Sequence, residues 1–536
     1  MLTADSPPTP AADAGAPPWW SPFRRSEFAK LWAANVLGLI GIAMSDMASG
    51  WLMTSLDADP RAVSWVQVAA NLPMFLFTLP AGALTDMFDL RRFLLVVEAG
   101  VVAITLSFAA MVSFGAASPF ALLTITFALS AAWTATAPAW LAVLPLLVSK
   151  RDLDSATAIN SAGYNVSRAI GPAVGGIAIA TLGAAAPFWI FGAINIATVL
   201  VLLWWRSPRS SGARLPVEPF GSALRIGFHH AANNRHLMST LGRTAAFFPA
   251  ASAYWALLPL LAREQMGGGA AIFGVLLGAI GAGAIAGAFA LNWLKAKLGP
   301  DRLVDGGTLA TAAILALFSV VHDPVAGVVL CAAAGASWIL VLAPLYVSAQ
   351  VALPDWVRGR GLAIFLTVIF GSMTCGGAIW GQVAQAFGLP IAHMSAAACL
   401  LLTILGGSRW KLQTGATADF APSKHWRPPY IGREVEDREG PILVVTEYRI
   451  DSVNRGTLLR ALDEMKHERK RDGAYAWGVF ADPSNDSRLW ETFLIESWLE
   501  FRLFCERISN DDRLIEDRIR ELLVSPPNMR VMIAPK

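Results

Sequence analysis

Three ionisable residues stand out inside long apolar runs of this 536-residue chain: Asp46, Glu98 and Arg168. A charge at the centre of a bilayer costs ~2.5–3.5 kcal/mol even on the lower of the published scales, so such residues usually face a cavity or a partner. A carboxylate that faces a cavity could take up and release a proton, whereas one that faces Arg168 could form a static ion pair. We therefore predict Asp46 and Glu98 as candidate proton-coupling residues and Arg168 as a candidate cavity residue.

Uncharged polar residues in neighbouring runs could line the same cavity. The candidates are Asn71, Asn160 and Asn165. Each could instead only bridge two helices, since amides hydrogen-bond across helix interfaces in membranes.

Enzyme-type and metal chemistry have little support in the residue pattern. The four cysteines, Cys331, Cys375, Cys399 and Cys505, include no CxxC pair, so neither a disulfide framework nor a zinc site is indicated. The net charge of +3 is too small to favour nucleic acid as a partner. We predict no catalytic residue, no metal site and no cofactor.

A short polar segment at 82–92 could act as a conformational latch. It contains Gly82, Asp86, Arg91 and Arg92. A carboxylate at a helix end can pair with basic residues or a helix N-terminus in one conformation and lose that partner in another. The simpler interpretation is a surface turn whose arginines set the membrane topology.

A second motif, at 168–176, is rich in small residues. Gly171, Pro172, Gly175 and Gly176 allow helices to approach closely and to bend. We predict a helix-packing hinge there, with plain small-residue packing as the alternative.

These motifs resemble those of the major facilitator superfamily, whose loop signature and antiporter motif match 82–92 and 171–176 respectively. Met87, Asp89, Ala158 and Ser167 depart from the usual residues at their positions. Further strings are similar to one branch, the enterobactin-exporter-like transporters or transmembrane secretion effectors: 138–148, 153–173, 258–263 and 353–360. The resemblance covers about residues 23–535 and implies secondary active transport, with export as the expected direction.

The elements that must position these residues are membrane-spanning helices. Between Ala29 and Gly406, 33 of 378 residues are charged, against 43 of 130 from Gly407 to Lys536. A helix of about 20 apolar residues crosses the hydrocarbon layer. The predicted spans are 29–54, 63–85, 93–115, 119–147, 157–182, 187–205, 240–262, 270–294, 303–321, 324–350, 361–387 and 389–406.

Charge in the loops predicts the orientation. Even-numbered loops carry fourteen Lys and Arg residues and odd-numbered loops carry only Arg61 and Arg263. The positive-inside rule then places the even loops and both termini in the cytoplasm, which makes the chain a multi-pass protein of the inner membrane. Ala137-Pro138 and Ala343-Pro344 occupy matching places in two sets of six spans, and internal repeats of this kind are typical of transporters.

The last hundred residues change pattern. Strand-like runs at 442–450, 475–480, 489–497 and 530–533 alternate with helical stretches at 454–471 and 499–523. This βαββαβ order predicts a ferredoxin-like α+β domain. Some such domains are monooxygenases, but Phe501 stands where the resemblance leads us to expect His. We favour a binding or self-associating module over an oxygenase.

The expected organisation follows: a disordered cytoplasmic leader (1–22), an N-terminal six-helix half (23–205), a cytoplasmic central loop (206–239), a C-terminal six-helix half (240–406), a linker (407–440) and a soluble α+β domain (441–536). The fold class is an all-α membrane protein of twelve helices with a small α+β appendage. We predict a proton-coupled exporter of a small amphiphilic molecule, siderophore-like or drug-like, that works by alternating access. Open alternatives are an importer or lipid flippase of the same fold, and a membrane-tethered monooxygenase. The expected partners are the lipid bilayer, a small-molecule substrate, protons and, through the soluble domain, a second copy.

Overall fold

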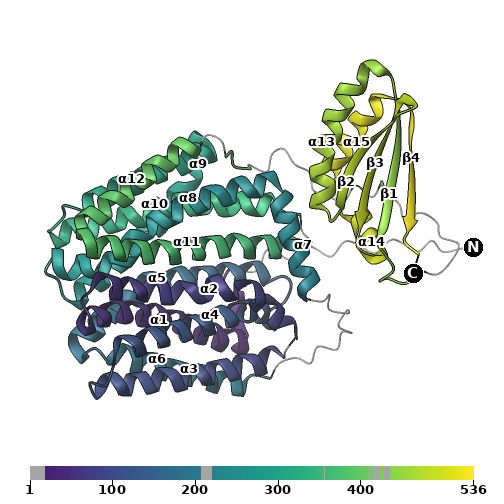
Figure 1. Ribbon diagram of the computed structural model, residues 1–536. Helices are drawn as coiled ribbons and strands as arrows, with labels where there is room; N and C mark the ends of the chain where they lie inside the picture. The colour runs from purple at the N-terminus through teal and green to yellow at the C-terminus, as the bar shows by residue number, and fades with distance from the viewer. Residues whose placement is uncertain are drawn as a thin grey trace, which may run out of the picture.

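The computed structural model describes residues 18–87, 89–206, 220–354, 356–407, 410–413, 423, 425–426 and 435–535. It contains a large helical bundle and a smaller domain with one sheet (Figure 1). Within the described residues, ten helices are long and apolar enough to cross a membrane. The chain is thus mostly helical, with a small C-terminal sheet.

The first half of the bundle begins after a 3-10 turn, η1 (Ser21–Arg24), and has six helices. They are α1 (Ser26–Leu56), α2 (Pro60–Met87), α3 (Leu90–Ser113), α4 (Pro119–Leu147), α5 (Leu153–Leu182) and α6 (Ala186–Trp204). Five of these are among the ten apolar helices, and α5 is not. Its sequence carries polar residues along one face, as shown below.

The second half is built from longer elements. It comprises α8 (Arg235–Leu260), a π-helical turn η2 (Leu261–Gln265), α9 (Ala270–Phe318), α10 (Pro324–Val351), α11 (Arg358–Phe387) and α12 (Leu389–Gly407). Two predicted spans, 270–294 and 303–321, are joined in α9 across a kink at Gly299, where φ is +75°. Pro300 follows this kink at a position where a new helix tolerates proline.

One expected loop is partly helical. The segment 206–239 contains α7 (Phe220–Asn233), and α8 begins at Arg235, five residues before the predicted span. Asn234 separates the two helices because its side chain accepts a hydrogen bond from the backbone N–H of Leu237 and so caps α8.

The two halves meet along two seams. Helix α2 packs along α11, and α5 packs along the first part of α9. Glycines permit the second contact: a Cβ on Gly274 would lie 2.6 Å from the Pro172 carbonyl oxygen, and a Cβ on Gly176 would lie 2.7 Å from the Ala270 carbonyl oxygen.

Three hydrogen bonds join the halves among the described residues, and all lie at one end of the bundle. Arg263 donates to the hydroxyls of Thr54 (2.9 Å) and Ser55 (3.1 Å), and Gln385 donates to Asp59 (3.0 Å). We call this the sealed end, which carries loops 57–59 and 266–269. The opposite end, where α1 and α3 begin, is the open end.

Side chains at the open end bind within one half. Arg91 donates to the carbonyl oxygens of Leu202 (2.8 Å) and Leu203 (2.6 Å), at the last turn of α6. In the other half, Arg243 of α8 forms ion pairs with Asp301 (3.2 Å) and Asp305 (3.4 Å) of α9. These contacts hold each half together without joining the two.

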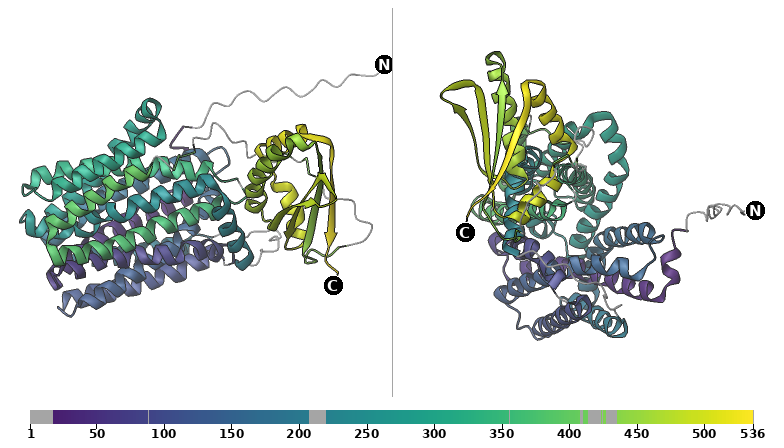
Figure 2. Two further views of the ribbon diagram at one scale, coloured as in Figure 1. Left: turned by 45° about the horizontal axis from the view of Figure 1, so that its top comes forward. Right: turned by 90° about the vertical axis from the view of Figure 1, so that its right-hand side faces the viewer.

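The C-terminal domain has one antiparallel sheet with helices on one face (Figure 2). Its elements are β1 (Ile442–Ile450), the turn η3 (Ser452–Asn454), α13 (Arg455–Arg471), β2 (Tyr475–Asp482), β3 (Asn485–Ile495), α14 (Trp498–Arg507), α15 (Asn510–Glu521) and β4 (Leu523–Ile533), and the strand order is β2-β3-β1-β4. Val444 pairs with Phe493 on one side and Val531 on the other, which sets the apolar face toward the helices.

The helical stretch predicted at 499–523 is divided into α14 and α15. Ser509 begins α15 with a capping box, because its hydroxyl accepts from the Asp512 N–H while the Asp512 carboxylate accepts from the Ser509 N–H. The preceding residue, Ile508, is extended.

The soluble domain docks on the second half through α7 and the segment before α11. The Nδ1–H of His230 donates to the Arg471 carbonyl oxygen (3.1 Å), which leaves Nε2 to accept from Asn234 (3.5 Å). Burial, followed by the nearby Arg471 charge, lowers the pKa of His230 to about 3. Trp356 lies between this imidazole, 5.4 Å away, and the guanidinium of Arg507, 4.2 Å from its ring.

A buried charge network links the sheet to its helices. Arg469 donates to Glu516 (2.7 Å), and its Nε lies 3.7 Å from a carboxylate oxygen of Glu491. Glu491 also accepts from Tyr448 (2.7 Å) and Trp477 (2.8 Å). Burial alone would raise the pKa of Glu516, but the Arg469 charge and the His425 hydrogen bond outweigh it and lower that pKa to about 2.

We expect Arg469→Met to destabilise the soluble domain by about 3–5 kcal/mol, because two buried carboxylates lose their cation. Amide hydrogen exchange of β1 and β3 in the full-length protein measures this, and Arg502→Met, at an exposed ion pair with Asp437, is the control. The Glu516 contribution to wild-type stability is present above its ordinary pKa of 4.5 and is lost as the pH falls toward 2. Equal protection in the two variants would contradict the expectation.

We expect Gly176→Val to force the halves apart at the sealed end, because the new side chain would meet the α9 backbone. Spin labels placed on α5 and α9 should show a longer distance than in the unsubstituted protein. Gly306→Ala is the control, since a Cβ there meets nothing within 4 Å. An unchanged distance in Gly176→Val would refute the close contact.

Candidate functional site

One face of α5 carries polar side chains that are exposed although the helix lies within the bundle. Asp154, Ala158, Ser161, Asn165 and Arg168 follow a helical spacing and are all exposed; we call this set the α5 stripe. A separate exposed face is entirely apolar, as a surface against lipid must be, and comprises Val166, Ile170, Val174 and Ile177. The α5 stripe is therefore the exposed face of the helix that is suited to contact water.

Arg168 stands where the α5 stripe meets the seam between the halves. The next residue, Ala169, touches α9: a Cβ on Gly281 would lie 2.8 Å from the Ala169 Cα, and one on Gly278 would lie 3.2 Å from its carbonyl oxygen. The water-facing surface thus begins at the open end of the bundle and ends near Arg168.

The charges of Asp46 and Arg168 lie near one another without pairing. Asp46 is exposed in α1 and interacts electrostatically with Arg168. Neither side chain has an ion pair or hydrogen bond within the part of the chain that the structure describes. Arg168 also interacts electrostatically with Tyr254 of α8 and lies 5.9 Å from the ring of Tyr164. It is therefore close to both halves.

An aromatic cluster lies in the second half, and its member Tyr254 interacts electrostatically with Arg168. Tyr254 and Trp255 lie 5.3 Å apart by ring centroids, and both pack on Trp338, at 6.1 and 5.7 Å. The Tyr254 hydroxyl and the Trp255 indole N–H are buried, and neither has a hydrogen-bond partner in good geometry among the described residues. The sequence analysis missed this pair, for which an adjacent Tyr and Trp within an apolar run was the available signal.

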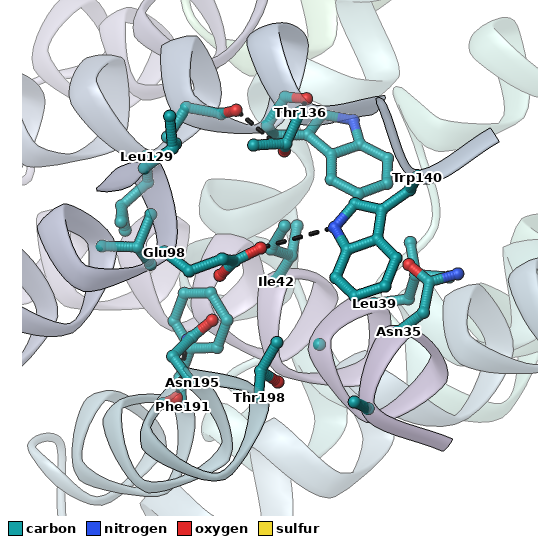
Figure 3. Close-up of a pocket in the computed structure, with 16 residues that line it drawn as sticks. Asn35, Leu39, Ile42, Glu98, Leu129, Thr136, Trp140, Phe191, Asn195 and Thr198 are labelled. Atoms are coloured by element: carbon teal, nitrogen blue, oxygen red, sulfur yellow. Dashed lines mark hydrogen bonds between the residues drawn. The ribbon is translucent and has the colours of Figure 1, made fainter. Parts of the chain in front are cut away.

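Glu98 occupies a different place, inside the first half. Figure 3 shows its carboxylate pointing into a cavity between α1, α3, α4 and α6, where it accepts a hydrogen bond from the indole N–H of Trp140 (3.4 Å). The cavity has a volume of about 30 Å³, enough for about two water molecules. Its other polar lining residues are Asn35, Thr136, Asn195 and Thr198. The cavity is therefore large enough to hold water beside the Glu98 carboxylate.

The three predicted asparagines do not form one site. Asn71 donates to the carbonyl oxygen of Gln67 (2.9 Å) and is buried in α2, and Asn160 accepts from Asn35 (3.2 Å) between α5 and α1. Only Asn165 belongs to the α5 stripe, where its amide donates to the Ser161 carbonyl oxygen (2.9 Å).

The predicted hinge residues serve two different contacts. Gly171 and Gly175 pack α5 on α1 within the first half, where a Cβ on Gly171 would lie 2.7 Å from the Ala43 Cβ. Gly176 packs across to α9 in the second half. Pro172 is buried between these contacts, and its carbonyl oxygen is the atom nearest to Gly274.

The predicted latch is described only in part. The backbone of Gly82 and Asp86 lies in the last turns of α2, but their side chains fall outside the described residues. Arg91 binds the end of α6, as noted above, and the backbone N–H of Arg92 donates to Asp89, the N-cap of α3 (2.9 Å). The sequence analysis did not anticipate the contact between Arg91 and α6.

Two residues of the C-terminal region bear on enzyme chemistry, Phe501 and His425. Phe501 is fully buried in its core, and His425 pairs with Glu516 at 2.6 Å. Among the described residues, no cluster of three His, Cys, Asp or Glu side chains could hold a metal ion.

Comparisons with known proteins agree with this architecture. Residues 17–534 match the model of the family described as "Transmembrane secretion effector". The enterobactin exporter EntS of Salmonella typhi is 29% identical over 296 residues, 52% of this chain and 68% of that protein. The multidrug efflux pump Tap of Mycobacterium bovis is 26% identical over 407 residues, 73% and 94% of the two chains.

Solved structures share the fold of the bundle at low identity. The nucleoside transporter NupG, as a D323A mutant, superposes with a TM-score of 0.60 at 12% identity, over 72% of this chain and 99% of that one. A bacterial homologue of the human lysosomal transporter Spinster, inward-facing and unoccupied, gives 0.54 at 13% identity, over 74% and 98%. With the family match covering nearly its whole length, the chain belongs to the transmembrane secretion effectors, a family of major facilitator transporters.

Proposed function

We propose that this protein is a secondary active exporter that spans the inner membrane twelve times and moves a small amphiphilic molecule by alternating access. One observation carries the proposal: the α5 stripe is exposed from the open end of the bundle to Arg168, while the halves are joined at the sealed end. A path that is accessible from one end only is one of the two states that alternating access requires.

The count of twelve rests on how two elements are interpreted. Helix α9 supplies two spans on either side of its kink at Gly299, and α5 spans the membrane with its polar face toward the water-filled path. Basic residues in the even-numbered loops favour a cytoplasmic open end and cytoplasmic termini. The state described is then the one that loads substrate from the cytoplasm.

Export is favoured by the relatives, since EntS is named an exporter and Tap an efflux pump. The same rocking bundle could run as an importer or flippase under other gradients, and no contact in the described residues favours those directions. The substrate class of this chain is a small amphiphile of the kind that the two relatives' names imply, siderophore-like or drug-like.

Proton coupling is the proposed energy source, through Asp46 or Glu98. Asp46 lies beside Arg168 near the seam, where a change in the packing of the halves would alter its surroundings. Glu98 lies in a water-sized cavity of one half. Asp86 with Arg91 and Arg92 is the proposed latch, and Gly171, Pro172, Gly175 and Gly176 the proposed hinge.

For the soluble domain we propose a ferredoxin-like fold that acts as a binding or self-associating module. Its strand order, β2-β3-β1-β4 with all neighbours antiparallel, supports the fold. The buried Phe501 and the mutual pairing of its internal charges count against an oxygenase.

The substrate should be found by untargeted metabolite profiling of cells and spent medium. We expect one compound to move from medium to cytoplasm in a deletion strain and in a strain carrying Asp86→Asn, because loss of the latch carboxylate impairs alternation. A strain with a stop codon after Gly415 shows whether the soluble domain is needed. No shift in the deletion strain would contradict constitutive export.

The coupling residue should be identified with that compound in everted membrane vesicles. We expect replacement of the coupling carboxylate, by Asp46→Asn or Glu98→Gln, to abolish the response of transport to an imposed pH gradient while counterflow exchange continues. Asp154→Asn, at the mouth of the α5 stripe, is the control for loss of a carboxylate. Undiminished proton-dependent transport in a variant removes that residue from consideration.

A further inference from the structure

The α5 stripe ends in the positive charge of Arg168. Arg168 is exposed, and within the described part of the chain its guanidinium makes no hydrogen bond and has no carboxylate within 4.0 Å. A guanidinium has five N–H donors in a fork that matches a carboxylate, sulfonate or phosphate. Leaving these donors without a protein partner in a membrane-spanning helix is costly unless water or a ligand occupies them.

The surroundings of Arg168 supply more donors than acceptors. The Tyr254 hydroxyl and the Trp255 indole N–H are buried in the facing half without a partner in good geometry. The indole N–H can only donate, and the phenol can donate. Asp46 is a charged acceptor near Arg168, and it forms no ion pair with it. Such a set of donors fits an acidic group better than a basic one.

The wall behind these donors is aromatic. Trp338 contacts Tyr254, Trp255 and Phe248, the last with ring centroids 5.0 Å apart. Rings packed edge to face present both apolar surface and polarised C–H edges to a flat ligand. The cluster belongs to α8 and α10, whereas Arg168 belongs to α5, so a ligand between them would touch both halves.

We propose that Arg168 binds the acidic group of the substrate, and that the substrate is an organic anion with an aromatic body that packs on the Tyr254–Trp255–Trp338 cluster. This inference rests on the proposed transport function and adds the substrate class to it. A ligand held by one half through its charge and by the other through its ring contacts both halves of the bundle. The affinity of the ligand therefore differs between states in which the halves are closer together and states in which they are farther apart.

A matched pair of probes tests the class directly. Radiolabelled 2-naphthoate and 2-naphthamide have the same ring system and differ in the negative charge. Scintillation-proximity binding to the purified full-length protein needs no knowledge of the natural substrate. We expect the wild type to bind 2-naphthoate about tenfold or more tightly than 2-naphthamide, the range of one charge-assisted hydrogen-bonded contact.

The variants separate the role of Arg168 from a loss of folding. Arg168→Gln should bring the two probes to equal affinity, whereas Arg168→Lys, which keeps the charge but not the fork, should retain part of the preference. Tyr254→Phe should weaken 2-naphthoate binding a few-fold. Arg151→Gln, at an exposed arginine before α5, is the matched control and should behave as wild type. Elution of each variant as a single species in gel filtration shows that it is folded.

Three results would overturn the proposal: equal binding of the two probes by wild type, failure of both to bind, or a preference for 2-naphthoate that persists in Arg168→Gln. Competition by the cationic dye ethidium in place of 2-naphthoate would assign the site to cations through Asp46 instead. None of these results bears on export itself, which the metabolite profiles measure independently.

Discussion

The cost of placing a guanidinium inside a membrane governs the arrangement of the bundle. Arg168 forms no ion pair or hydrogen bond among the described residues, and its exposed position at the end of the α5 stripe would let water reach it from the open end. Access of water to Arg168 requires α5 to be polar on one face and removes it from the set of uniformly apolar helices. It also requires the sealed end to close beyond Arg168, since a path open at both ends would let ions through.

Closure at the sealed end depends on small residues. At Gly176 and Gly274 the backbones of α5 and α9 approach so closely that no side chain fits between them. Packing of this kind gains its energy from many short contacts and none from interdigitated side chains, so it can be broken and remade without moving a large residue past another. The three hydrogen bonds from Arg263 and Gln385 close the same end in the loops. An inter-half contact with these properties is suited to a cycle in which it must open.

Local sequence patterns predicted the parts of the structure that depend on local physics. Hydrophobic runs located the helices of the first half, and a run rich in β-forming residues placed β1 at 442–450, the range observed. Local sequence patterns did not predict helix boundaries that a single residue determines. The kinked continuity of α9 depends on a positive φ at Gly299, and the division of 499–523 depends on one capping box at Ser509. For the site, the sequence indicated Asp46, Glu98 and Arg168 as charges in apolar runs. It could not show that Glu98 lies in a separate cavity or that Tyr254 interacts electrostatically with Arg168, because both facts depend on how distant helices pack.

The separation of Glu98 from Arg168 matters for whether the protein moves an anion and a proton in the same direction or in opposite directions. If an organic anion binds at Arg168, its charge also favours a proton on the nearby Asp46, so anion and proton stabilise one another there. If the anion and the proton stabilise one another's binding, they move across the membrane in the same direction. Exchange of an anion for a proton requires instead that each ligand weaken the binding of the other. Glu98 lies in its own cavity of the first half, lined by residues of α1, α3, α4 and α6, and a ligand charge at Arg168 should influence it less than it influences Asp46. On electrostatic grounds an exporter of anions that exchanges protons would use Glu98 for exchange and Asp46 to tune the affinity of Arg168. A membrane potential that is negative inside would add to the driving force, because it expels anions.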